Sequence, residues 1–245
     1  MRNFKMILQY EGTRYQGWQR QETSENTIQG KLEALLSKMC GHRVEVQGSG
    51  RTDAGVHAAG QVANAHLETD RSAQEILSYM NSYLPEDIAV IAVEEVSERF
   101  HSRLNAKGKT YLYRVINSAL PHVFERKFTY RLEEKLDVAA MRKAAELLCG
   151  THDFAAFTSA KKSKKSTVRT VEEIRIEEQK DEIFFYFSGN GFLFHMVRIL
   201  MGTLLEVGMG KREASEMPDI LDSGKRERAG ALAPSRGLTL LEVRY

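Results

Sequence analysis

The first hundred residues alternate between strand-like and helix-like segments, in an order that few folds accommodate. Strands, recognised by apolar alternation or a short apolar run, are predicted at residues 4–10, 44–46, 61–65 and 87–93. Helices, recognised by apolar residues at helical spacing, are predicted at residues 28–39 and 73–84, the second ended by Pro85. Strand–helix–strand–strand–helix–strand is the order of a ferredoxin-like unit. An α+β fold is therefore predicted for this half.

The second half shows the same mixture of strands and helices, although no sequence repeat is visible. Further strands are predicted at residues 109–116, 174–176, 183–187 and 238–243. Asp137 is expected to cap a helix over 138–148, and Asn190 a long helix that begins at Phe192. On that helix, His195, Arg198 and Gly202 would share one face, which a loop could approach closely. Two domains are predicted, residues 1–104 and residues 105–245.

Composition excludes several classes of protein. Of the 245 residues, 42% are hydrophobic and 28% charged, which is ordinary for a soluble globular protein. No apolar stretch reaches the roughly 18 residues that span a bilayer. The N-terminus runs directly into a strand-like segment, so no secretory signal is expected. Cys40 and Cys149 are too few for a disulfide framework or a cysteine zinc site, and a cytoplasmic location is expected.

Charge is unevenly distributed along the chain. Residues 68–98 hold eight acids and one base, whereas residues 101–131 hold seven Lys or Arg and one acid. This sorting indicates one face that would attract phosphates and another that would not, although accidental clustering on a solvated surface is the alternative.

One acid, Asp53, lies in a glycine-flanked stretch, Gly48–Ala58, with Arg51 two residues before it. Apolar segments on both sides predict a tight loop between two strands. A carboxylate exposed there beside a guanidinium would stay ionised and could attack an electrophilic carbon. A purely structural turn is the alternative, because aspartate side chains readily bond nearby backbone N–H groups. The glycine spacing fits neither a dinucleotide-binding nor a P-loop motif.

The whole eleven-residue stretch resembles the signature of the TruA family of tRNA pseudouridine synthases. Further blocks resemble the same family, in family order along nearly the whole chain: residues 10–13, 17–21, 27–30, 100–103, 109–111, 192–198 and 233–238. The resemblance implies two α/β halves joined into a mixed, mainly antiparallel sheet with a central active-site cleft. It also implies isomerisation of uridine in the anticodon stem-loop of tRNA by a homodimer. Neither a cofactor nor a metal is expected.

The resemblance also assigns roles to individual residues. Asp53 is the expected catalytic residue, Arg198 its ion-pair partner, and Tyr111 the ring that stacks on the target base. Arg51 is expected to hold the flipped nucleotide or the space it leaves, with His57 and His195 as further substrate-binding candidates. Tyr113 is expected only to fill the core. Lys109 belongs to a basic set expected to contact the RNA backbone, the others being Lys107, Arg114, Lys161, Lys162, Lys164 and Lys165.

Three positions depart from the family pattern: Glu11 for aspartate, Leu104 for an aromatic residue, and Gly108 before the strand of Tyr111. None replaces an expected catalytic residue. Two other functions are alternatives. One is a catalytically inert RNA-binding module that uses the basic face alone. The other is a hydrolase or nuclease using Asp53 with His57 or His101, which lacks a second placed carboxylate or a metal cluster.

Overall fold

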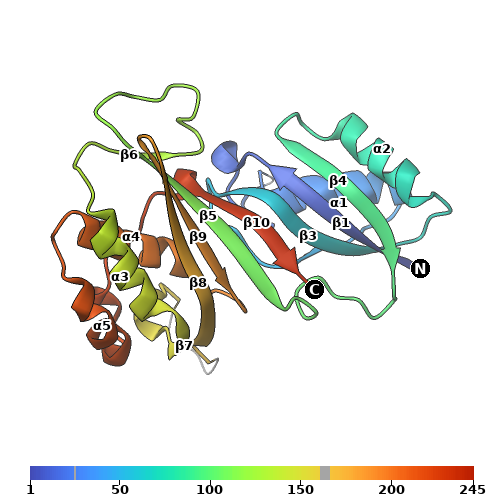
Figure 1. The fold of residues 1–245 in the computed structure, drawn as a ribbon. Helices are drawn as coiled ribbons and strands as arrows, with labels where there is room; N and C mark the ends of the chain where they lie inside the picture. The colour runs from blue at the N-terminus through green and yellow to red at the C-terminus, as the bar shows by residue number, and fades with distance from the viewer. Residues whose placement is uncertain (25, 161–165) are drawn as a thin grey trace. The chain divides into compact units, whose positions relative to one another are not determined.

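A computed structural model describes residues 1–24, 26–160 and 166–245. The chain forms two compact units, one of Met1–Lys107 with Thr239–Tyr245 and one of Gly108–Leu238 (Figure 1). The first boundary lies three residues beyond the predicted one. The last seven residues differ from the prediction, since they belong to the first unit rather than the second. The reason is strand pairing, because Thr239 and Leu240 pair in parallel with His57 and Ala58.

The first unit has the predicted order of elements, which are β1 (Arg2–Tyr10), α1 (Ile28–Cys40), β2 (Gln47–Gly48), β3 (His57–Leu67), α2 (Ala73–Tyr83) and β4 (Ile88–Val96). Strand β1 pairs antiparallel with both β3 and β4, and β2 pairs antiparallel with β3. The C-terminal strand β10 (Leu238–Arg244) pairs in parallel with β3. Helix α2 packs on β4 and contacts α1. The ferredoxin-like order predicted for this half is therefore confirmed.

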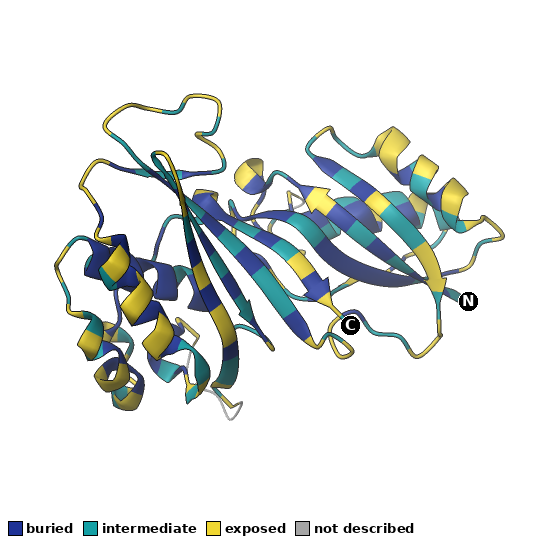
Figure 2. Ribbon diagram, viewed as in Figure 1, coloured by how far each residue is buried: buried dark blue, intermediate teal, exposed yellow. Residues whose placement is uncertain are grey.

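Both helices of the first unit begin and end where their sequences predict. The Thr27 hydroxyl accepts from the Gly30 N–H at the start of α1, and Gly41 ends that helix in the left-handed region at φ 74°. Ser72 and Glu75 form a capping box at the start of α2. Ile28, Leu32 and Leu36 of α1 and Ile76 and Met80 of α2 are buried, while other residues of α2 are exposed (Figure 2).

The second unit is also a mixed α and β structure. Its elements are β5 (Gly108–Asn117), β6 (Tyr130–Leu132), α3 (Val138–Leu148), β7 (Gly150–Asp153), β8 (Val168–Gln179), β9 (Glu182–Gly189), α4 (Met196–Gly208) and α5 (Met217–Ser223). Strands β5, β9, β8 and β7 follow one another antiparallel, and β6 pairs with β5 in parallel. Helix α3, capped by Asp137 as predicted, packs against β8 and α4. The predicted α+β class holds in each unit.

Two predicted elements are wrong. Residues 44–46 are not a strand, and only Gln47–Gly48 pairs with β3. Side chains of α1 take the backbone groups that a strand would use: Ser37 accepts from the Val44 N–H, Glu33 accepts from the Val46 N–H, and Gln29 donates to the Val46 carbonyl. Asn190 does not cap a helix, because its side chain accepts from the Thr170 N–H. Helix α4 therefore begins at Met196, not at Phe192.

Candidate active site

Asp53 lies on a loop whose backbone is bonded on both sides of it. The Trp18 N–H donates to the Thr52 carbonyl (3.0 Å), and the Gly55 N–H donates to the Tyr15 carbonyl (3.3 Å). A third bond, from the Val56 N–H to the Asp53 carbonyl (3.1 Å), closes a tight turn. The Asp53 side chain is half-buried. The predicted tight loop is confirmed, and its backbone is fixed by the segment that follows β1.

Glycines allow these two segments to approach so closely. Gly17 has φ +84°, and a Cβ there would lie 2.6 Å from the Thr52 carbonyl oxygen. A Cβ on Gly12 would lie 2.0 Å from the Val56 carbonyl oxygen. Backbone therefore packs on backbone at two points, and no other residue type fits either position without displacing the loop.

A buried polar group under the loop holds its first residues. Gln61 of β3 is fully buried; it accepts from the Ser49 hydroxyl (2.7 Å) and donates to the Gly50 carbonyl (3.0 Å). The hydroxyls of Tyr10 and Thr52 share a 2.8 Å hydrogen bond. Burial raises the pKa of Tyr10 to about 12. Sequence reasoning missed the roles of Gln61 and Tyr10, although the glutamine at the start of the mostly apolar 61–65 run was an available signal.

Arg51 is exposed, and its Nε donates to Oε1 of Gln19 at 2.9 Å. His57 is 1% exposed, and its Nδ1 accepts from the Gly12 N–H at 3.0 Å. The imidazole therefore supports the short helical turn Gly12–Arg14 (η1) from inside. Glu11, one of the departures from the family pattern, accepts from the Thr13 N–H (2.8 Å) at the start of the same turn.

In the second unit, Arg198 lies in the first turn of α4 and is half-buried. Its Nε donates to the Ala233 carbonyl at 2.8 Å, and its own carbonyl accepts from the Ala233 N–H at 3.1 Å. One turn on, a Cβ at Gly202 would lie 1.7 Å from the Ala231 carbonyl oxygen. The predicted close approach of a loop to Arg198 and Gly202 is confirmed. His195 is not on that helical face; it is the residue before α4, with φ 65° and its ring stacked on Phe194.

Tyr111 and Tyr113 lie two residues apart on β5 and have different surroundings. Tyr111 is 8% exposed, and its ring meets that of Phe192 edge-on at 5.4 Å. Tyr113 is fully buried, and its hydroxyl donates to the Pro234 carbonyl at 2.8 Å. Burial also raises the pKa of Tyr113. Tyr113 therefore fills the core, as the sequence predicted.

The basic residues expected at the RNA backbone differ in how they are held. Lys107 is exposed, and Lys109 is half-buried at the start of β5. Arg114 is not available for such a contact, because its guanidinium pairs with Glu125 (2.7 Å) and Glu182 (2.5 Å). Lys161, Lys162, Lys164 and Lys165 lie outside the described residues.

The structure thus collects Asp53, Arg51 and His57 in the first unit, and Tyr111, Lys109, His195 and Arg198 in the second. Within the described ranges, no group of three or more His, Cys, Asp or Glu side chains could hold a metal ion. None of the helices in the described part of the chain is both long enough and apolar enough to cross a membrane.

Comparison with known proteins gives matches along the full chain. A family model described as tRNA pseudouridine synthase matches residues 6–105 and 144–245. "tRNA pseudouridine synthase A" of Bacillus sp. (strain KSM-64) is 49% identical over 245 residues, covering all of both chains. "tRNA pseudouridine synthase A 1" of Clostridium tetani (strain Massachusetts / E88) is 48% identical with the same coverage.

Among solved structures, a chain of a Cbf5-Nop10-Gar1 complex matches with a TM-score of 0.35 and 14% identity, over 82% of this chain and 45% of that one. The family match and the full-length identities of 49% and 48% are much stronger, and they agree with the glycine-flanked Asp53 loop found in the structure. The chain belongs to the TruA family of tRNA pseudouridine synthases.

Proposed function

We propose that this protein converts uridine to pseudouridine in tRNA, with Asp53 as the residue that begins the reaction. The reaction breaks the bond between uracil N1 and ribose C1′, turns the base, and joins C5 to C1′. The C5 proton leaves and N1 gains a proton, so atoms balance without an oxidant or reductant. A carboxylate can begin this sequence by attack at C6, by attack at C1′, or by removing a ribose proton.

The observation that carries this proposal is the half-buried carboxylate of Asp53 on a loop whose backbone is fixed on both sides. A catalytic group must be held in a reactive geometry, and backbone hydrogen bonds achieve this while the side chain remains reachable. The family resemblance assigns to Arg198 the role of ion-pair partner of the catalytic acid. Tyr111 stacks on the target base.

The target uridine must leave its stack before Asp53 can reach it, at a cost of a few kcal/mol. Arg51, two residues from Asp53 and exposed, holds the flipped nucleotide or the space it leaves. Lys109 contacts the RNA backbone, and His195 lies near the substrate. His57 acts from inside the fold, since its ring is buried against Gly12.

The substrate is the anticodon stem-loop of tRNA, and two copies of the chain act together on it in the cytoplasm. Both assignments extend to this chain what its resemblance to the family implies. Light scattering of the purified protein, alone and with tRNA, would test the dimer, and a monomer in both conditions would contradict it.

Release of tritium from tRNA labelled at uridine C5 tests the function. We expect the wild type to release label without shortening the RNA, and Asp53→Ala to bind tRNA but release none. Asp222→Asn, an exposed acid on α5, is the matched control and should match the wild type. Equal release from the wild type and Asp53→Ala would remove the site assignment, whereas shortened RNA would indicate a nuclease.

A further inference from the structure

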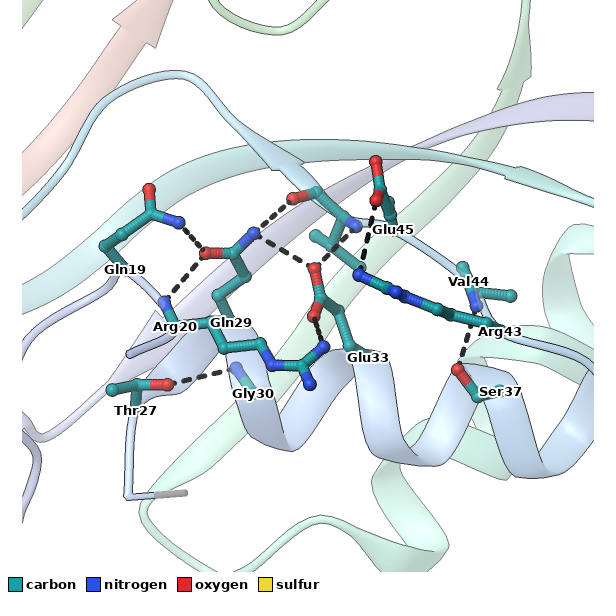
Figure 3. Close-up of polar contacts among 11 residues, drawn as sticks. Gln19, Arg20, Thr27, Gln29, Gly30, Glu33, Ser37, Arg43, Val44 and Glu45 are labelled. Atoms are coloured by element: carbon teal, nitrogen blue, oxygen red, sulfur yellow. Dashed lines mark hydrogen bonds and ion pairs between the residues drawn. The ribbon is translucent and has the colours of Figure 1, made fainter. Parts of the chain in front are cut away.

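A chain of side-chain hydrogen bonds connects helix α1 to Arg51, and the catalytic scheme above does not use it. Its origin is Glu33, a buried carboxylate on α1. Glu33 Oε1 accepts from Gln29 Nε2 at 3.0 Å, and Gln29 Oε1 accepts from Gln19 Nε2 at 2.7 Å. Gln19 Oε1 in turn accepts from Arg51 Nε at 2.9 Å. Figure 3 shows the first three members of this relay, Glu33, Gln29 and Gln19.

The direction of the relay is set by its buried acid. An ionised carboxylate only accepts hydrogen bonds, so Gln29 must turn its NH₂ group toward Glu33. Two backbone contacts require the same orientation, because Gln29 Nε2 also donates to the Val46 carbonyl and its Oε1 accepts from the Arg20 N–H. Gln19 must then donate to Gln29, which leaves its carbonyl oxygen for Arg51. Each amide can therefore adopt only one orientation.

The acid itself is fully engaged. Its second oxygen accepts from the Arg20 guanidinium at 3.1 Å, and its first also accepts from the Val46 N–H at 3.1 Å. A buried charge with partners on both oxygens is held in one place. The relay therefore begins at a fixed point of the helix and ends at the exposed guanidinium beside Asp53.

We propose that Gln19, Gln29 and Glu33 are positioning residues that fix the guanidinium of Arg51 for contact with the RNA. Within the described residues, the one hydrogen bond of this guanidinium is the bond from Nε to Gln19. The relay thus holds the inner nitrogen and leaves both terminal nitrogens for a phosphate or an extruded nucleotide. This inference rests on the proposed function and adds the means by which Arg51 is oriented.

The test combines kinetics with a measurement on the free protein. Gln19→Leu should lower the single-turnover rate on tRNA by about 10-fold, because a bond to a charged group is lost. Gln19→Glu keeps an acceptor for Arg51 Nε but loses the bond donated to Gln29 Oε1, so it should recover only part of that rate. Gln16→Leu, the same change at an exposed glutamine three residues earlier, should match the wild type. A double variant with Arg51→Ala should be no slower than Arg51→Ala alone.

The Arg51 Nε–Hε signal in ¹⁵N-labelled protein without RNA reports the relay directly. It should exchange slowly with water in the wild type and Gln16→Leu, and fast in Gln19→Leu. If an active preparation gave equal rates for Gln19→Leu and Gln16→Leu, or additive losses with Arg51→Ala, the relay would be refuted while the proposed function stood. A wild type that forms no pseudouridine would refute both.

Discussion

The Asp53 loop and the start of helix α4 both carry side chains assigned to the reaction, yet they are held by different contacts. The loop is held by polar groups: backbone bonds to Tyr15 and Trp18, a buried glutamine and a tyrosine–threonine hydroxyl pair. Helix α4 is held mainly by apolar burial, since nearly all its residues are buried. Among the described residues, no side chain caps its first turn, where the preceding residue is His195.

This difference has a physical consequence. Polar contacts specify one loop geometry but add little net stability, because the same groups bond water in the unfolded chain. Apolar burial contributes much more to stability. We therefore expect changes on the loop to affect the reaction more than folding, and changes along α4 to affect folding first.

The largest expected effect is on catalysis and comes from the loop. Asp53→Asn keeps the size of the side chain and removes its charge, so the single-turnover rate should fall by about 10⁴-fold or more. Urea titration should give a free energy of unfolding within about 0.5 kcal/mol of that of the wild type, because the side chain is only half-buried. A large loss of stability in Asp53→Asn would contradict the expectation that changes on the loop affect the reaction more than folding.

Next is Gly202→Ala on α4. The added methyl would lie 1.7 Å from the Ala231 carbonyl oxygen, so the 230–234 segment must move away from the helix. We expect a loss of about 3 kcal/mol in free energy of unfolding, measured by urea titration. Gly191→Ala, where the nearest atom lies 3.9 Å away, is the matched control and should change stability little. If the two variants proved equally stable, the close packing of this segment would be refuted.

The third prediction concerns alkaline pH and the tyrosine beneath the loop. The pKa of Tyr10 is raised from 10.0 to about 12, so the folded protein holds this proton more tightly than the unfolded chain. Its contribution to stability is complete below pH 10 and is lost as the pH rises through 12, by about 3 kcal/mol in all. Tyr10→Phe should start about 1 kcal/mol less stable at pH 8, having lost the bond to Thr52, and then lose less as the pH rises.

Stability at several pH values between 8 and 12 measures this effect. Tyr83→Phe is the control, because Tyr83 is 59% exposed and its substitution should leave the pH profile unchanged. Parallel profiles for Tyr10→Phe and the wild type would contradict the assignment of this alkaline loss to Tyr10.

The smallest expected effect is that of Tyr113→Phe. The ring remains, but the hydroxyl bond to the Pro234 carbonyl is lost, which should cost about 1 kcal/mol in free energy of unfolding. Thermal denaturation of Tyr113→Phe against Tyr186→Phe, a half-buried tyrosine on β9, measures the difference. The reaction rate of Tyr113→Phe should stay near that of the wild type, and a loss of rate without a loss of stability would assign Tyr113 a role in catalysis.

Much of the fold could be predicted because its signals are local. Apolar periodicity located the main strands, and short-range caps such as Thr27 and Asp137 located helix starts, since both act within a few residues. The Asp53 loop was likewise predictable, because glycines, an arginine and an acid stand together in one stretch. Its assignment to catalysis came from the family resemblance rather than from local chemistry.

The predictions that failed are those in which a group far away in the sequence makes the hydrogen bond that a local pattern had assigned to a neighbour. Asn190 has the chemistry of a helix cap, but the Thr170 N–H, twenty residues away, binds its side chain. Residues 44–46 have a strand pattern, but glutamate, glutamine and serine side chains of α1 bind their backbone. Arg114 was predicted to contact RNA, but in the structure its guanidinium forms ion pairs with Glu125 and Glu182.

By itself, then, the sequence determined the order of strands and helices, most of their ends, and the loop that carries Asp53. Tertiary structure alone decided where α4 begins, that the last strand pairs with β3, and that Gln19, Gln29 and Glu33 reach Arg51. The physical reason is the range of the interactions. Periodicity and capping act over a few residues, whereas polar groups bond to whichever partner folding brings within about 3 Å, however far away it lies in the chain.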